Sequence, residues 1–346
     1  MKIVFRVDSS TQIGSGHLMR CLTLAERKRK QYQADIIFVM RDLEGNLIDL
    51  VVQKGFKSII LPKSNVDYNL DGYEEWLTVP QNVDAEEVKN ILQDIEQVDL
   101  LIVDSYAIDI NWETIVRPFV KQIMVIDDLA NRKHDCDILL DQNFYLDKES
   151  RYNGLVPNYC RLCLGPEYAL LREEFYEVKK NLRKRDGAIK NILVFFGGSD
   201  ITNETMKALK AIVMLDRKDI TVNVIVGQSN QHKDMIASFC NNYDYMNYYC
   251  QVDNIAEFMN EADLSIGAGG TTTWERCFME LPSIVVSIAD NQHAGCEFIS
   301  ENAGIIYYIG KNDFISTTDI KNAISNIDNS WYSSMITNMK KLLGGN

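Results

Sequence analysis

Short apolar runs alternate with amphipathic helical patterns along nearly the whole of this 346-residue chain. That alternation is typical of parallel β-sheets whose strands are joined by crossover helices, so we expect an α/β fold. Strands are expected at residues 2–8, 35–40, 57–61, 98–104, 122–127, 137–141, 191–196, 221–226, 246–249, 263–266, 283–287 and 305–308. At about 150 residues per domain, the length favours two doubly wound, Rossmann-like domains that face each other across a cleft.

A charged segment over residues 176–190, poor in large apolar side chains, separates the two sets of strands. We therefore expect an N-terminal domain over 1–180, which carries a Gly-rich loop, and a C-terminal domain over 187–315. The basic run from Lys179 to Arg185 is expected to be a solvated helix end. The last segment, 316–346, has a helical pattern at about 318–344 and is expected to pack back on the N-terminal domain.

The composition excludes several classes of partner. With 36 Lys and Arg against 49 Asp and Glu, the formal net charge is −13, so a nucleic-acid-binding protein is not expected. No apolar run approaches the roughly 18 residues of a membrane span, and the first residues are too few and too charged for a signal peptide. The eight cysteines include one CxxC pair, Cys160 and Cys163, and this scatter favours reduced thiols over zinc. We expect a cytoplasmic protein with no membrane insertion, no metal and no cofactor.

The loop after the first strand, residues 8–17, is a candidate ligand site, because open parallel sheets bind ligands beyond the carboxyl ends of their strands. Gly14 and Gly16 let the backbone come close to a ligand, but Met19 replaces the third glycine of a dinucleotide fingerprint. The helix that follows carries one apolar stripe, at Leu18, Cys21, Leu22 and Ala25. The helix dipole disfavours the imidazolium of His17 in its first turn. We expect His17 to act as a neutral general base; the alternative is a histidine that caps or packs.

A second Gly-rich loop, residues 267–275, precedes another helix. The backbone N–H groups around Gly270 and the hydroxyls of Thr271 and Thr272 suit phosphate oxygens, so we expect this loop to bind phosphate. Glu275, in the first turn of the helix, has two open interpretations: compensation of the helix dipole, or a bidentate contact with a ribose diol. The loop lacks a Walker lysine, which disfavours a nucleoside triphosphatase.

Two further sets of polar residues follow strands. Asn291, after the strand at 283–287, is suited to hydrogen-bond sugar hydroxyls or N-acetyl groups, and its neighbour Asp290 is suited to cap the next helix. In the first half, carboxylates end the strands at Asp8, Asp104, Asp127, Asp128 and Asp141. They could bind a divalent metal, but strand-end aspartates more often cap helices, so no metal site is expected.

The run from Arg6 to Ala25 resembles the opening signature of one family, the bacterial UDP-2,4-diacetamido-2,4,6-trideoxy-β-L-altropyranose hydrolases of pseudaminic acid biosynthesis. Looser resemblances follow at 165–175, at 196–200 and in the second Gly-rich loop, so the likeness runs from residue 2 to about 310. It implies a GT-B-like fold whose C-terminal domain holds UDP, and a role in making a nonulosonic acid of surface glycans such as those on flagellin. The chain departs from the family at Ser105, where relatives can have His, and in the segment after 310.

The resemblance also implies roles for individual residues. His17 would be the catalytic base, Tyr106 and Asn291 would line the sugar site, and Arg172 and Glu275 would contact the substrate, Glu275 at the ribose. Because UDP is a good leaving group, hydrolysis needs one base and a site for the departing diphosphate, not the paired carboxylates of a glycosidase. We therefore expect His17 to activate water for attack on the anomeric carbon. Cleavage of the C–O bond with inversion is what the family implies.

Three other functions stay open. A GT-B glycosyltransferase would use an acceptor hydroxyl in place of water, a nucleotide-sugar sensor would bind without turnover, and a metal-dependent hydrolase would use the strand-end aspartates. The expected partner is a small-molecule UDP-sugar, and a monomer is compatible with the sequence, which leaves the oligomeric state open. The stereochemistry of the sugar, the role of the segment after 310 and any assistance by a divalent metal are equally open.

Overall fold

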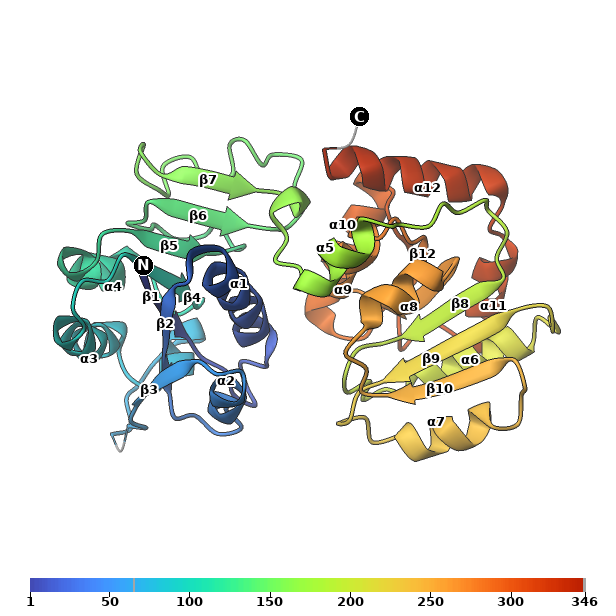
Figure 1. The fold of residues 1–346 in the computed structure, drawn as a ribbon, viewed down its shortest axis with the longest axis horizontal. Helices are drawn as coiled ribbons and strands as arrows, with labels where there is room; N and C mark the ends of the chain where they lie inside the picture. Colours follow the sequence, from blue (N-terminus) through green and yellow to red (C-terminus); the bar gives the residue numbers. More distant parts are fainter. Residues whose placement is uncertain (65, 345–346) are drawn as a thin grey trace. The chain divides into compact units, whose positions relative to one another are not determined.

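The structure, a computed structural model, describes residues 1–64 and 66–344; the side chains of residues 290 and 291 lie outside the description. The chain divides into two compact units, Met1–Leu170 and Leu171–Asn346, each with a parallel sheet covered by helices (Figure 1). The expected α/β class is confirmed. The units divide ten residues before residue 180, because helix α5 (Glu173–Lys179) packs on α8 (Ile255–Glu261) and α9 (Thr272–Phe278).

Seven parallel strands form the sheet of the first unit, in the order β3-β2-β1-β4-β5-β6-β7. They are β1 (Lys2–Val7), β2 (Asp35–Arg41), β3 (Lys57–Leu61), β4 (Leu100–Asp104), β5 (Ile123–Ile126), β6 (Ile138–Asp141) and β7 (Arg161–Leu164). The first six are the strands that the sequence predicts. Strand β7 is an addition: it has four residues at the edge of the sheet, too few for a periodic pattern to be recognised.

Helices cover both faces of this sheet. The first layer contains α1 (Gly16–Tyr32) and α2 (Ile48–Gln53), and the second contains α3 (Gln81–Asp94) and α4 (Ile110–Val116). The predicted stripe of α1 is confirmed, since Leu18, Cys21, Leu22 and Ala25 are buried in one cluster with side chains of β1 and β2. This burial holds the first turn of α1 at the carboxyl edge of the sheet.

The sheet of the second unit has the order β10-β9-β8-β11-β12-β13, again all parallel. Its strands are β8 (Asn191–Phe195), β9 (Thr221–Val226), β10 (Met246–Cys250), β11 (Leu264–Ala268), β12 (Ser283–Ser287) and β13 (Tyr307–Lys311). Its helices also include α6 (Glu204–Val213), α7 (Lys233–Cys240) and α10 (Asp290–Asn302). Both sheets share the 3-2-1-4-5-6 order of doubly wound nucleotide-binding folds.

The C-terminal segment forms two helices, α11 (Thr317–Ser325) and α12 (Asn329–Leu342), where the pattern predicts one stretch. Asp328 begins α12 by accepting a hydrogen bond from the N–H of Trp331. Helix α12 contacts α9, and the Tyr332 hydroxyl donates to the carbonyl of Asp263 at 2.7 Å. These contacts of α12 lie within the second unit, whereas the sequence-based expectation places the segment on the first domain.

The basic run from Lys179 to Arg185 begins at the end of α5 and exposes Lys180 and Lys184, as predicted for a solvated helix end, but the prediction is wrong for its two arginines. Arg183 donates to the carbonyl of Asn260 and pairs with Asp263 at 2.5 Å. Arg185 donates to the carbonyls of Ala262 and Met279, at the C-terminal ends of α8 and α9. Carbonyls at a helix C-terminus have no intrahelical partner, and guanidinium groups satisfy them here. In the part of the chain that the structure describes, no helix is both long and apolar enough to cross a bilayer.

Candidate functional site

The loop between β1 and α1 presents bare backbone at the carboxyl edge of the first sheet. The N–H of Gly14 donates to the carbonyl of Ser10 at 2.8 Å, which closes a tight turn with Gly14 at a φ of +79°. A side chain at Gly14 would be strained by that φ. Among the described residues, apart from the chain neighbours of each glycine and the adjoining helix backbone, no heavy atom lies within 4 Å of where a Cβ would stand on Gly14 or on Gly16. The space beside both glycines is therefore open to a ligand.

His17 forms a tight cluster with two charged residues. Its Nδ1 lies 2.6 Å from Oδ1 of Asp104, the last residue of β4. Arg20, one turn further along α1, grips the same carboxylate with Nε and Nη2, each at 2.6 Å. Strand β4 pairs with β1 in parallel, and this pairing brings the end of β4 next to the loop after β1. The cluster therefore follows from the sheet order.

The hydrogen bond to Asp104 fixes the tautomer of His17. Burial acts to raise the pKa of Asp104, but the Arg20 guanidinium and the His17 ring outweigh it and hold that pKa well below its usual range. A carboxylate only accepts hydrogen bonds, so Nδ1 carries a hydrogen and Nε2 is the ring nitrogen that remains to act as a base. Among the described residues none forms a hydrogen bond with Nε2, which is not fully enclosed, and His17 is 9% exposed. Nε2 is thus a free acceptor with a narrow opening.

Aromatic rings surround the His17 ring. Tyr106 meets it edge-on, with centroids 4.7 Å apart, and Trp76 does so at 5.9 Å. Trp76 lies in the 3₁₀ helix η1 (Gly72–Leu77), and Tyr73 of the same segment packs on Tyr106 at 5.2 Å. The hydroxyl of Tyr106 donates to Oδ1 of Asp128 at 2.6 Å. Burial and the Asp128 carboxylate raise the pKa of Tyr106, so it remains a protonated donor.

The strand-end aspartates of the first unit have arginine partners. The pairs are Asp8 with Arg6, Asp104 and Asp128 with Arg20, Asp127 with Arg132, and Asp141 with Arg151, at 2.6 to 3.5 Å. Within residues 1–64 and 66–344 there is no group of three or more His, Cys, Asp or Glu side chains placed to hold a metal ion. Each aspartate of this edge thus has an arginine beside it.

Asp141 gives this edge a pH-dependent contribution to stability. Burial raises its pKa to about 7, although the N–H of Asn143 and the Arg151 guanidinium act to lower it. Between the ordinary value near 4 and about 7, the native state therefore holds a proton that the unfolded state has lost, so stability falls as the pH rises. We expect Asp141→Asn to remove this dependence and to be more stable than the wild type at pH 8 by roughly 3 kcal/mol, with little difference at pH 4.

Urea unfolding between pH 4 and 8 tests this expectation. Asp141 now accepts from the Asn143 N–H at 3.0 Å and from the Tyr152 hydroxyl at 2.9 Å, through different oxygens. In asparagine Oδ1 can keep the first bond, while Nδ2 can donate to the Tyr152 hydroxyl oxygen, whose hydrogen is left for the Asp127 carbonyl at 2.9 Å. Asp147→Asn, at an exposed position of the same region, is the matched control and should follow the wild-type pH profile. Parallel profiles for Asp141→Asn and the wild type would contradict the assignment.

The second Gly-rich loop lies at the carboxyl edge of the other sheet, between β11 and α9. The N–H groups of Thr273 and Trp274 donate within the loop, to the carbonyls of Gly270 and Thr271. Among the described residues the N–H groups of Thr271 and Thr272 have no partner, as is usual at the start of a helix. Gly270 and Thr271 are exposed. The predicted loop therefore presents two free donors and two hydroxyls.

Arg172 and Glu275, both singled out in the sequence, meet in the second unit. Arg172 Nη2 donates to Oε1 of Glu275 at 3.3 Å, and its Nη1 pairs with Glu174 at 2.8 Å. Burial raises the pKa of Glu275, although Arg172 partly lowers it. The side chain of Glu275 is 16% exposed. The Asn291 side chain, expected at the sugar, lies outside the described residues; Asn291 itself is in the first turn of α10.

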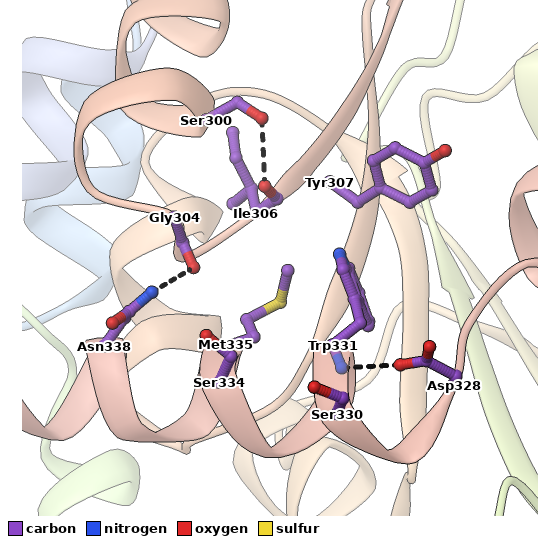
Figure 2. Close-up of a pocket in the computed structure, with 10 residues that line it drawn as sticks. All are labelled: Ser300, Gly304, Ile306, Tyr307, Asp328, Ser330, Trp331, Ser334, Met335 and Asn338. Carbon is purple, nitrogen blue, oxygen red and sulfur yellow. Dashed lines mark hydrogen bonds between the residues drawn. The ribbon is translucent and has the colours of Figure 1, made fainter.

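A pocket of about 440 Å³ lies elsewhere in the second unit, between α12 and the turn from α10 to β13 (Figure 2). Trp331 and Met335 of α12 line it, together with Ser300, Tyr307 and Asn338. Two of its polar side chains are paired with backbone carbonyls: Asn338 donates to that of Gly304, and Ser300 donates to that of Ile306. It lies near the start of β13, at the edge of the sheet opposite the Gly-rich loop, and no sequence motif falls in it.

Several residues of the first cluster escape sequence reasoning. The sequence could have indicated Arg20, because it lies three residues after His17 and therefore on the same face of α1. Asp104 is visible as a strand-end carboxylate, but its partner depends on β4 pairing with β1. No sequence pattern indicates that Tyr73 and Trp76 lie near His17, because η1 is in a connecting segment without hydrophobic periodicity.

Comparisons with known proteins show which sequences and which folds this chain resembles. Residues 191–338 match the glycosyltransferase family 28 C-terminal domain. The chain is 30% identical over 311 residues to the UDP-2,4-diacetamido-2,4,6-trideoxy-β-L-altropyranose hydrolase of Campylobacter jejuni, which covers 89% of this chain and 99% of that protein. It is also 30% identical over 295 residues to an uncharacterised protein of Methanocaldococcus jannaschii, over 83% of this chain, and it spans only 55% of that protein.

Solved structures agree on the fold. The crystal structure of Acinetobacter baumannii MurG superimposes with a TM-score of 0.63 at 12% identity, over 98% of this chain and 94% of that one. At this identity the likeness shows the fold alone. The expected GT-B architecture is confirmed.

Proposed function

Since the chain belongs to the family of UDP-2,4-diacetamido-2,4,6-trideoxy-β-L-altropyranose hydrolases, we propose that it hydrolyses this UDP-sugar to UDP and the free diacetamido sugar, as a step of pseudaminic acid biosynthesis. The observation that carries the proposal is the hydrogen bond between His17 Nδ1 and Asp104, which leaves Nε2 as a base. The His17 ring follows the open backbone of Gly14 and Gly16, at the carboxyl edge of a doubly wound sheet.

His17 acts as the general base in this proposal. Nε2 accepts a proton from water while the water oxygen attacks the anomeric carbon. The bond from that carbon to the UDP oxygen breaks, the electron pair leaves with UDP, and the sugar is released with inverted configuration. Asp104 holds the ring in the productive tautomer and stabilises the imidazolium that forms, and Arg20 keeps Asp104 ionised.

The two ends of the substrate are assigned to different units. In the first unit Gly14, Gly16 and Tyr106 line the sugar end, where the Tyr106 ring packs edge-on against His17. A bare backbone can hydrogen-bond the amides of the sugar's acetamido groups, and an aromatic ring suits its apolar methyl groups.

In the second unit Gly270, Thr271 and Thr272 bind the diphosphate through their N–H and hydroxyl groups. Glu275, oriented by Arg172, accepts hydrogen bonds from the ribose hydroxyls, and Asn291 is assigned to the sugar. No protonated acid is required at the leaving oxygen, because these donors stabilise the charge that develops on UDP.

The alternative is a glycosyltransferase of the same fold, which family 28 similarity over residues 191–338 also fits. Release of UDP from the purified protein and the UDP-diacetamido sugar, with no acceptor added, separates the two activities. We expect turnover without acceptor and in the presence of EDTA, and an NMR time course in which the first product is the inverted anomer. Release that needs an acceptor would favour the transferase, loss in EDTA a metal-dependent hydrolase, and binding of UDP without turnover a sensor.

A further inference from the structure

A buried arginine lies directly under the second Gly-rich loop. Arg276, on α9, is 1% exposed. Its Nη2 donates to the carbonyl of Ala268 at 2.9 Å and to Oγ1 of Thr273 at 3.2 Å, which are the two ends of the loop. The guanidinium therefore links the two ends of the loop from its buried side.

The rest of the Arg276 guanidinium is unsatisfied. Among the described residues, neither Nε nor Nη1 has a hydrogen-bond partner, and no carboxylate forms an ion pair with this side chain. Burial lowers the pKa of Arg276 to about 10, although Cys296 and Glu275 oppose that shift, so the group is still a cation near pH 7. A buried, unpaired cation with free donors is costly, and folds rarely keep one without a counter-charge.

The nearest acidic side chain does not supply that counter-charge. Glu275 is the neighbour of Arg276 in the sequence, but its Oε1 is directed to Arg172 at 3.3 Å. A Cβ on Gly267 would meet the backbone carbonyl of Phe195 first and would also lie 2.9 Å from Arg276 Nη1, so glycine at this strand position leaves room for both groups. The Arg276 cation is therefore accommodated at the loop, and no carboxylate of the described residues neutralises its charge.

We propose that Arg276 is a positioning residue for the phosphates of the nucleotide: it fixes the Gly-rich loop and supplies the buried positive charge that the diphosphate neutralises. This inference rests on the proposed function, in which the same loop receives UDP. It assigns the discrimination between a nucleoside and its phosphates to one side chain that does not face solvent.

If the positive charge of Arg276 attracts the phosphates, its removal should weaken binding more for ligands with more phosphate groups, which a purely structural role would not do. In Arg276→Met, the affinity for UDP should fall by about 10- to 100-fold, that for UMP by less, and that for uridine by under about twofold, because the lost attraction grows with the number of phosphate charges. Calorimetric titration of uridine, UMP and UDP into the full-length protein measures all three. Arg217→Met, which removes an exposed arginine paired with Asp219, is the matched control and should leave the three affinities unchanged.

Two results would overturn the inference: equal losses for uridine, UMP and UDP, which indicate a loop that has merely lost its shape, or no loss for UDP. If Arg276→Met does not fold, Arg276→Gln decides, since it keeps a donor for the Ala268 carbonyl without the charge and should show the same gradation. A wild-type protein that does not bind UDP would instead contradict the proposed function. Wild-type binding of UDP that either variant retains in full would contradict this inference alone.

Discussion

We expect the His17→Ala variant to lose UDP release from the UDP-diacetamido sugar by about 10³-fold, the contribution that a positioned general base makes to a rate. Its affinity for UDP should change by less than about twofold, because the loop assigned to the diphosphate belongs to the other unit. The fold should survive, since Asp104 keeps both hydrogen bonds from Arg20. Steady-state UDP release and calorimetric titration of UDP, on the same preparation, give the two numbers.

A second histidine serves as the control for that experiment. His232 lies in the second unit, where its ring contacts the backbone of Ile201, and His232→Ala should keep wild-type turnover. If His17→Ala retained activity within tenfold of the wild type, which corresponds to about 1.4 kcal/mol of barrier, His17 would not be the base.

Replacing Asp84 by alanine should destabilise the first unit by about 3–5 kcal/mol, because the buried guanidinium groups of Arg6 and Arg41 then lose the one carboxylate that they share. Asp84, on α3, is fully buried and accepts hydrogen bonds from Arg6 at 2.6 Å, from Arg41 at 2.7 Å and from the Trp112 indole at 2.9 Å. Burial acts to raise the pKa of Asp84, but Arg6 and Arg41 outweigh it and lower that pKa. Ionised Asp84 therefore stabilises the fold fully above the ordinary aspartate pKa near 4, and this stabilisation is lost as the pH falls from there through the lowered native pKa.

Urea unfolding followed by hydrogen exchange locates the effect, since peptides of residues 1–170 should lose protection before those of the second unit. Glu86→Ala, two residues along the same helix, removes only an exposed pair with Lys89 and should cost less than about 0.5 kcal/mol. A loss of similar size in both variants would mean that the buried network contributes nothing beyond a surface ion pair.

The strands show where sequence reasoning is strong. Buried strands such as Leu100–Asp104 and Ser283–Ser287 are continuous apolar runs, so their positions can be read from the chain. Strand Arg161–Leu164 is a short edge strand with an exposed first residue, and it has no such run. The division of the chain at Leu170 depends on which helices α5 contacts, and no local pattern encodes that choice.

The site divides in the same way. His17 and the two glycines before it are recognisable, because a loop between a strand and a helix is a local feature with its own residue types. The partner of His17 is not local: Asp104 is 87 residues away and reaches it only because β4 pairs with β1. The same holds for Arg6 and Asp84, which are 78 residues apart and look like ordinary surface charges in the sequence.

By itself the sequence determined the α/β class, nearly all the strands, the two glycine loops and the identity of the imidazole, since each depends on neighbours along the chain. Only the tertiary structure decided which tautomer that imidazole adopts, which arginines lie buried and which of them has no counter-charge. Hydrogen bonds and burial are set by distance in space, and the order of strands in a sheet brings together residues that the chain keeps far apart.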